Sequence, residues 1–261
     1  MLTTTAGYKT AIDATTRQLQ SRVSVYFDAT PTVFTGSRLI KWSLLEETKS
    51  DLGALGRVSS NTLKLTLANY DRALTPTNSL GSYYGKLLPN VKIELEIGLL
   101  VGAAYEWLPL GTFWSGDWLA PESSIEATVD CYDRLYALGK LDVPVASVQR
   151  ATTVATMLTL LFTLLDLDSA EYSVDASLTQ PITIGWLGDG SVAQCLQMLA
   201  EAGNACVYMD RSNVIQARSL ARVDASSLTV TDTSQLLDVQ FPQRYKDIHS
   251  QVTVSVYSPA D

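Results

Sequence analysis

Histidine is nearly missing from this chain, which has His249 as its single copy among 261 residues. Serine and cysteine hydrolases commonly use a histidine base, and many metal sites bind through imidazole nitrogens. Any such centre would have to be built on His249, and no companion motif surrounds it. The sequence therefore predicts no catalytic residue, no metal ligand and no cofactor, and we expect a protein that is not an enzyme.

Basic residues are also scarce, with 19 Lys and Arg against 27 Asp and Glu and a net charge of −8. Binding to nucleic acid without sequence preference requires clustered cations that displace counterions from phosphates. Docking on anionic lipid requires a similar excess of positive charge. We therefore expect neither specific nucleic-acid binding nor attachment to an acidic membrane surface.

Cysteine is limited to three residues, an odd number without the C-x-x-C spacing of a redox or zinc motif. Cys131 falls on the apparent inward face of a strand, and Cys195 on the apolar face of a helix. Unpaired cysteines commonly behave as small buried hydrophobic residues. We expect buried free thiols, including Cys206, and folding in a reducing compartment such as a cytosol.

Long apolar runs are missing as well. The most apolar run, Met157 to Leu167, is about 11 residues long, whereas a membrane-spanning helix needs about 20. The first residues lack the basic and then apolar layout of a signal peptide. We expect a soluble chain without membrane insertion and without a cleaved leader.

The chain is organised around the stretch Trp107 to Leu138, which predicts a long β-hairpin followed by a short helical turn. Period-2 alternation places two sets of side chains on opposite faces of the first strand: Leu110, Thr112, Trp114 and Trp118 on one, and Phe113, Ser115 and Asp117 on the other. A turn is expected around Pro121. The return strand has Ile125, Ala127, Val129 and Cys131 on one face. Gly139 is the expected helix end.

The region before this hairpin has the pattern of short strands and turns that is typical of an all-β domain. Strands are predicted at 17–27, 38–45, 57–68 and 91–97, with turns between them and no intervening helix. Together with the hairpin they make about six strands, which predicts an antiparallel β-barrel over residues 17–140. Residues 1–16 are small and polar without periodicity, and we interpret them as an N-terminal arm.

Residues 141–219 predict an α+β insert of two helices and a hairpin. A Pro-containing linker, 141–150, leads to a helix that Thr152 or Thr153 can cap. Its apolar face comprises Val154, Met157, Leu158, Leu161 and Leu165. A short strand, 172–174, precedes a second helix, which Asp189 or Ser191 caps and which Gly203 ends in the left-handed conformation. The buried face of that helix comprises Val192, Cys195, Leu196 and Leu199. Two strands at 205–209 and 214–218 complete the insert.

Residues 220–261 return to a β pattern, with strand candidates at 228–230, 237–241 and 251–257. The predicted fold is therefore mainly β with an α+β insert: an antiparallel β-barrel, a helix-helix-hairpin module, and returning strands of a second small barrel-like domain.

Three groups of acidic or glycine-rich residues are candidates for a catalytic, metal or phosphate site. Asp166 and Asp168 invite a calcium or glycosidase interpretation, but they end an apolar helix without further oxygen ligands. The acids Asp117, Asp130 and Asp133 have Arg134 as an available structural partner. The segment 185–190 before a helix lacks the Lys-Ser/Thr of a P-loop and the GxGxxG spacing. In each case a structural role is favoured.

The aromatic residues are more informative. Tyr83, Tyr84, Tyr105 and Trp107 are expected near a sheet rim, where they could form a sugar platform or anchor a protein interface. We favour the interface, because no set of polar residues for a carbohydrate is identifiable.

Three stretches, Tyr8 to Phe27, Leu110 to Gly139 and Gly190 to Arg218, resemble the tail or baseplate hub proteins of bacteriophages, including the N-terminal hub portion of tail-associated proteins. The segments TVDCYDRLYAL and ACVYMDRSNVIQAR carry the resemblance most clearly. In that family two barrel-like domains from each of three chains form a pseudo-sixfold ring. The ring adapts the hexameric tail tube to a threefold spike or fibre.

The resemblance implies a structural, homotrimeric virion hub at the tail tip or baseplate, assembled in the host bacterial cytoplasm. Its implied partners are the tail tube or a distal tail protein, and a spike or central fibre. Residues 17–140 would be the first ring domain and 220–261 a part of the second, although that segment is shorter than a full barrel. The alternative is a distal-tail or carbohydrate-binding module that recognises the host surface.

Overall fold

The computed structural model describes residues 4–46, 56–121, 124–188 and 190–220. The described residues all belong to one compact unit, which spans residues 1–221. His249, the loop at 51–55 and the strands predicted beyond residue 220 lie outside the described part. No helix within that part is long and apolar enough to cross a bilayer.

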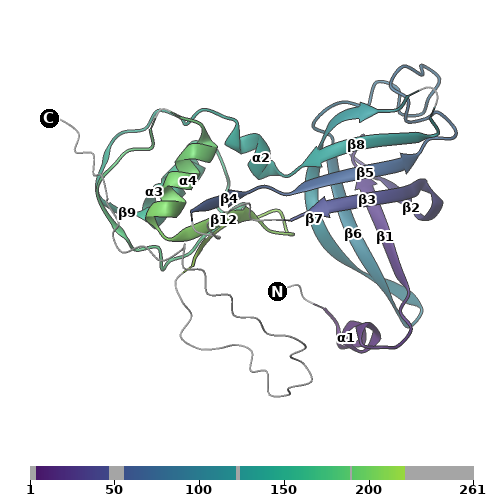
Figure 1. Ribbon diagram of the computed structural model, residues 1–261, viewed down its shortest axis with the longest axis horizontal. Coiled ribbons are helices and arrows are strands. Elements are labelled where there is room, and N and C mark those ends of the chain that lie inside the picture. The colour runs from purple at the N-terminus through teal and green to yellow at the C-terminus, as the bar shows by residue number, and fades with distance from the viewer. Residues whose placement is uncertain (1–3, 47–55, 122–123, 189, 221–261) are drawn as a thin grey trace, which may run out of the picture. The chain divides into compact units, whose positions relative to one another are not determined.

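The larger sheet of the described chain has seven antiparallel strands in the order β2-β1-β6-β7-β8-β5-β3 (Figure 1). Their bounds are Leu19–Val25 (β1), Thr32–Thr35 (β2), Leu39–Leu45 (β3), Thr62–Ala68 (β5), Lys92–Val101 (β6), Ala104–Leu119 (β7) and Glu126–Tyr132 (β8). The predicted mainly β fold is confirmed. Thr32 was expected in a turn and instead begins the additional strand β2.

A bent segment brings the two ends of this sheet together. Strand β2 pairs with β1, and β3 pairs with β5 at the other end of the sheet. A single 3-10 turn, η1 (Gly36–Arg38), connects β2 to β3, and it begins at Gly36 with a φ of +52°. Glycine adopts this left-handed conformation without the cost of a Cβ. Strands β2 and β3 are the two outermost strands of the sheet but are consecutive in the chain. The sheet must therefore curl so that its two ends come close together.

The interior of the curled sheet is apolar and continuous. Strands from all parts of the sheet contribute side chains with no measurable exposure, including Val23, Val25, Leu65, Leu67, Ile93, Leu95 and Cys131. Leu63, Leu65 and Leu67 alternate as buried residues in β5, and the predicted face with Ala127, Val129 and Cys131 is confirmed. Ile125, predicted on the same face, lies before β8 and is 64% exposed. Period-2 patterning was sufficient here because these strands pair without irregularity.

Strand β7 does not keep the predicted alternation. Phe113 and Ser115 are buried together with Leu110 and Trp118, whereas Thr112 and Trp114 are half-buried. The register of β7 shifts twice, opposite Leu95–Glu96 and between Ser115 and Trp118. Each β-bulge adds a residue that moves the following side chains to the other face. The predicted grouping therefore holds between the two bulges, for residues 112–115, and is wrong for Leu110 and Trp118 beyond them.

The predicted strand 57–68 is also two strands. Arg57–Ser59 (β4) pairs in parallel with Ala205–Met209 (β12), and only Ser60 and Asn61 separate β4 from β5. This segment thus passes directly from one sheet to the other.

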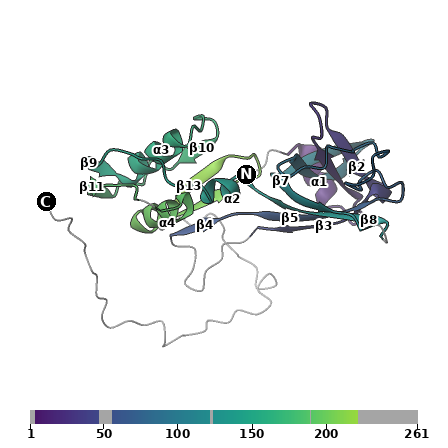
Figure 2. The ribbon, with the colours of Figure 1, turned by 90° about the horizontal axis from the view of Figure 1, so that it is seen from above.

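The second sheet has four strands in the order β10-β13-β12-β4, with β10 at Tyr172–Val174 and β13 at Ile215–Ser219. Helices α3 (Val154–Leu164) and α4 (Val192–Ala202) share one core with β12 and β13. Figure 2 shows both helices beside β9 (Gln149–Thr153) and β11 (Pro181–Gly185), which pair as a separate ribbon. The predicted linker thus contains a strand.

At α3 and α4 the predicted N-terminal caps are confirmed, whereas the predicted C-terminal one is not. The side chain of Thr153 accepts the first-turn N–H of α3, and Ser191 forms a capping box with Gln194 at α4. Gly203, however, has a φ of −90°, and Asn204 adopts the left-handed conformation at +49° instead. Asparagine tolerates this region better than most residues.

Residues 6–12 form a helix, α1 (Ala6–Ile12), where no periodicity was found. Thr5 caps it and also holds the carboxylate of Glu106 on β7, through its N–H at 2.9 Å and its hydroxyl at 2.5 Å. Gly7 lies so close to Val101 that an added Cβ would stand 2.8 Å from its methyl group. The N-terminal arm is therefore a helix fixed to the end of the β6–β7 hairpin.

Candidate functional site

The acids weighed as catalytic candidates have separate structural surroundings. Asp130 faces Lys64 across the sheet at 3.6 Å, and Asp117 is exposed. Arg134 pairs with Glu171, not with any of the three acids for which it was considered a partner. Among the described residues, no group of three or more His, Cys, Asp or Glu could hold a metal ion.

Asp133 is the exception, because its carboxylate is only 1% exposed. It caps α2 (Arg134–Gly139), where Oδ1 accepts the N–H of Tyr136 at 2.9 Å. Its other oxygen accepts the N–H of Asn61 at 2.6 Å. Burial raises the pKa of Asp133 to about 6, although these N–H donors oppose the shift.

The partners of Asp133 connect the two sheets. The N–H of Asp133 donates to the carbonyl of Asn61 at 3.1 Å, and the Asn61 amide donates to the Met209 carbonyl at the end of β12 at 3.2 Å. The surrounding loops meet again in the ion pair between Arg211 and Glu46. Asp133 thus has a structural role: its hydrogen bonds connect the start of α2 to Asn61, a residue between the two sheets. The sequence signal for it was an aspartate directly before a helical period, which is typical of an N-cap.

The other candidates lie after α3 and between β11 and α4. Asp166 follows α3 with a φ of +57°, and the N–H of Asp168 donates to the carboxylate of Glu171 at 2.9 Å. The strand before the glycine-rich segment, β11, pairs antiparallel with β9. A phosphate-binding loop follows a buried parallel strand, so this context does not match one.

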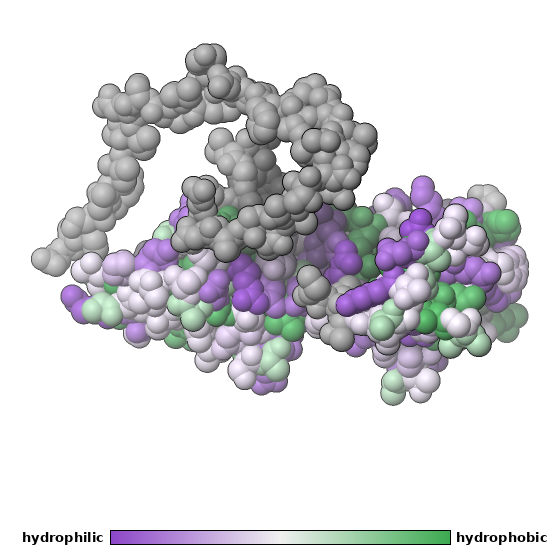
Figure 3. Space-filling model, turned by 90° about the horizontal axis from the view of Figure 1, so that it is seen from below, coloured by the Kyte–Doolittle hydropathy of each residue, from purple (hydrophilic) through white to green (hydrophobic). Residues whose placement is uncertain are grey.

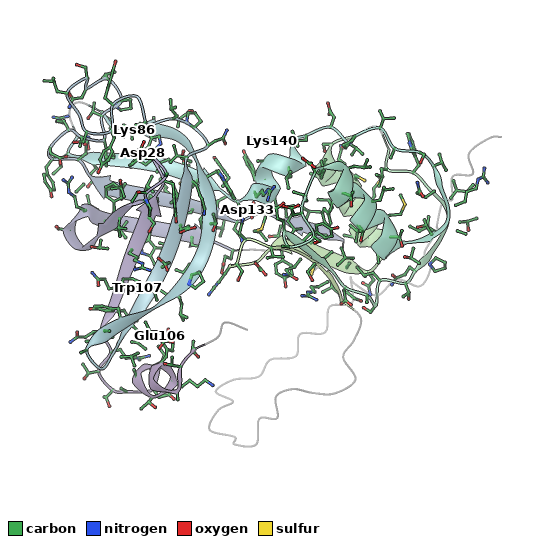
Figure 4. All side chains as sticks on the ribbon, turned by 180° about the vertical axis from the view of Figure 1, so that it is seen from behind. Asp28, Lys86, Glu106, Trp107, Asp133 and Lys140 are labelled. Carbon is green, nitrogen blue, oxygen red and sulfur yellow. The ribbon has the colours of Figure 1, made fainter. Side chains whose placement is uncertain are left out.

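The aromatic residues predicted at the sheet rim lie in different surroundings. Tyr83 stacks on Phe27 with ring centroids 4.6 Å apart and packs against the barrel core, whereas Tyr84 is 54% exposed. The indole of Trp107 lies beneath the guanidinium of Arg22 at 4.2 Å. Figure 4 shows Trp107 near Glu106 at one end of the sheet and the Asp28–Lys86 ion pair at the other. These aromatic residues do not form one platform.

Unpaired strand edges are the clearest candidate for a contact surface. Residues 19–21 of β1 extend beyond the region paired with β2, and the outer edge of β3 pairs with no strand of the described chain. The two edges border a hollow of about 460 Å³ lined by residues 19–21, 36 and 39–42. We call this region the β1–β3 seam.

The seam carries apolar side chains that are open to solvent. Leu19 is 56% exposed and Ile40 is 48% exposed, with Val33 and Leu45 similarly open on β2 and β3. Ile40 stands at a register shift, since Leu39 pairs with Leu67 and Lys41 with Thr66. Figure 3 shows apolar side chains reaching the surface over the larger sheet, at the right of the view. Open edges with apolar side chains are typical of contact surfaces.

Comparison with known proteins was informative only at the level of structure. No protein-family model matches the sequence, and no curated protein sequence matches it. A tail protein from Neisseria meningitidis MC58 superposes with a TM-score of 0.50 at 12% identity, over 76% of this chain. The chain has a tail-protein fold. The predicted resemblance is thereby confirmed at the level of fold.

Two further solved structures give lower scores. The 43 kDa tail protein of prophage MuSo2 from Shewanella oneidensis matches with a TM-score of 0.48 and 10% identity over 80% of this chain. The Francisella PdpA-VgrG complex matches with a TM-score of 0.48 and 13% identity, again over 80%. This chain spans 57% of the Shewanella chain, 50% of the Neisseria chain and 29% of the Francisella chain.

Proposed function

We propose that this chain is a structural component of a phage tail or a related injection machine. In this proposal three copies form a ring at the tail tip or baseplate, which adapts a hexameric tube to a threefold spike or fibre. The single observation that carries the structural role is the tail-protein fold. The ring, its place in the virion and its assembly in the host cytoplasm extend that observation through the resemblance of the three sequence stretches.

The β1–β3 seam supports assembly through contacts between copies. Among the described residues, its strand edges have backbone N–H and C=O groups without strand partners, and Leu19 and Ile40 expose apolar surface beside them. Covering apolar surface gains about 25 cal/mol per Å². A contact between two different surfaces of identical chains repeats around an axis, and it forms a ring when the rotation closes after a whole number of copies. The proposal therefore places the seam in the contact between neighbouring copies.

The test is the mass of the full chain in solution, measured by mass photometry over a range of concentrations. The expected species has three times the chain mass of 28.4 kDa. Ile40→Asp places a charge on the seam without removing a buried side chain, so we expect the trimer to be lost and the fold retained. Ile125→Asp is the matched control, because Ile125 is 64% exposed and lies outside the seam.

A chain that stays monomeric at all concentrations, and that captures neither tail-tube nor spike protein, would contradict the proposed function. A trimer that Ile40→Asp leaves intact would retain the ring but move the contact away from the seam.

A further inference from the structure

A cleft beside helix α2 has the features of a ligand site. Two hollows, of about 320 and 480 Å³, share Asn90, Trp114 and Ala137 in their walls. Trp114 is half-buried on β7, so its indole borders both hollows. Sites for small ligands are commonly a few hundred Å³ in volume, mostly apolar, with a few polar groups. The cleft is separate from the β1–β3 seam, which has no lining residue in common with it.

One wall of the cleft is a fixed stack of side chains. The rings of Tyr132 and Tyr136 lie 4.2 Å apart with an angle of 12° between their planes. The ammonium of Lys140 stands 4.0 Å from the centre of the Tyr136 ring. Tyr132 is also the cross-strand partner of Trp114. Figure 4 shows Asp133 and Lys140 beside α2, whose N-terminus the Asp133 carboxylate caps.

The opposite wall is fixed through Ser115. Its buried hydroxyl donates to the Leu88 carbonyl at 2.9 Å and accepts the N–H of Val91 at 3.0 Å. The N–H of Asn90 donates to the Ser115 carbonyl at 2.8 Å, and Asn90 has a φ of +64°. The loop therefore holds Asn90 in an uncommon conformation at the mouth of the cleft. Such conformations often occur at functional sites.

The open polar groups of the cleft are one cation, Lys140, and neutral groups that can form hydrogen bonds. Within the described chain, Lys140 pairs with no carboxylate, and neither the Asn90 amide nor the Trp114 indole N–H has a hydrogen-bond partner. The one carboxylate in the wall, Asp133, already accepts backbone N–H groups. A ligand that complements this set carries a negative charge for Lys140, hydroxyl groups for Asn90, and a flat apolar face for the aromatic rings.

We propose that this cleft binds an acidic saccharide, a sugar with a carboxylate substituent. The C–H face of the sugar ring lies on Trp114, its hydroxyls bond to the Asn90 amide, and its carboxylate pairs with Lys140. An acidic peptide offers the same charge, but it lacks the adjacent hydroxyl groups that an amide can bridge. This site goes beyond the proposed function, because a ring of tail proteins forms without it.

Binding is tested on the full chain by isothermal titration with tetragalacturonate, with maltotetraose as the neutral sugar and tetraglutamate as the acidic peptide. Tetragalacturonate is expected to bind at least tenfold more tightly than either. Trp114→Ala should weaken its binding at least tenfold, while Trp186→Ala, at an exposed tryptophan outside the cleft, should leave it unchanged. Since Trp114→Ala removes packing, each variant is checked by its thermal unfolding.

Lys140→Gln tests the charge without disturbing the fold, because Lys140 is exposed. This variant should bind tetragalacturonate about as weakly as maltotetraose and leave maltotetraose binding unchanged. Equal binding of tetragalacturonate by wild type and both cleft variants would overturn the proposal. So would tighter binding of tetraglutamate, or no saccharide binding at millimolar concentration. None of these results depends on whether the chain forms a trimer, so the two proposals fail separately.

Discussion

The two cores of the described chain are stabilised by different kinds of contact. The barrel core is formed by strands far apart in sequence, and it closes only when β2 pairs with β1 and β3 with β5. The α+β core is formed largely by two capped helices whose apolar faces are local in sequence. The barrel leaves edges and apolar side chains exposed at its seam, which suits a part that assembles. The comparison also shows that the insert is not independent of the barrel region, because its sheet includes β4, which directly precedes β5.

The largest expected effects come from removing one buried leucine from each core. Leu65→Ala in the barrel and Leu158→Ala in α3 both remove a side chain with no exposure, so each should lower the free energy of unfolding by about 2–5 kcal/mol. Strand β4 joins the insert sheet two residues before β5 enters the barrel. We therefore expect one shared transition in urea, followed by tryptophan fluorescence and far-ultraviolet circular dichroism.

Exposed Leu80, which is 95% open, provides the matched control as Leu80→Ala. Two separate transitions, each shifted by only one of the core substitutions, would show that the cores unfold independently.

Asp133 should give a smaller effect that depends on pH. Its pKa is raised to about 6 from an ordinary value of 3.8, so this group stabilises the fold below about pH 3.8 and loses that contribution as pH rises through 6. A shift of this size corresponds to roughly 3 kcal/mol between the two limits. Comparison with Asp133→Asn, which cannot titrate, isolates the effect from other carboxylates such as Asp71 and Glu171, whose pKa values are lowered.

The measurement is the difference in unfolding free energy between wild type and Asp133→Asn at several pH values from 4 to 8. Wild type should lose stability relative to the variant as pH rises across this range. A difference that stays constant would show that Asp133 does not titrate there. Asp130→Asn is the control, because Asp130 lies on the exposed face of β8.

Local patterns in the sequence were sufficient for several elements. The buried stripe of α3, with Met157, Leu158 and Leu161, follows from helical spacing, and the buried face of β5 from alternation. The division at Ser60–Asn61 was missed although Ser and Asn commonly bound strands, because β4 pairs only with a strand about 150 residues away. Leu110 and Trp118 were predicted on the face of Trp114 but lie on the face of Phe113, because bulges depend on the neighbouring strand.

The candidate sites were predictable to a smaller extent. The barrel fold follows from the density of short strands, but which edges remain open depends on long-range pairing, so the seam around Leu19 and Ile40 had no sequence signal. The cleft also joins distant residues, since Asn90 and Lys140 meet only through β7 and α2. Tyr83 was expected at the rim, but it packs against the core because Phe27 lies beside it.

The central claim, that copies of this chain meet through the β1–β3 seam, is tested most directly by hydrogen–deuterium exchange on the assembled and dissociated chain. Assembly should slow exchange at least tenfold at backbone amides of 19–21 and 39–42, while the exposed turn at 78–82 keeps its rate. An assembled trimer in which the seam amides exchange as fast as in the monomer, with protection found elsewhere, would contradict the claim.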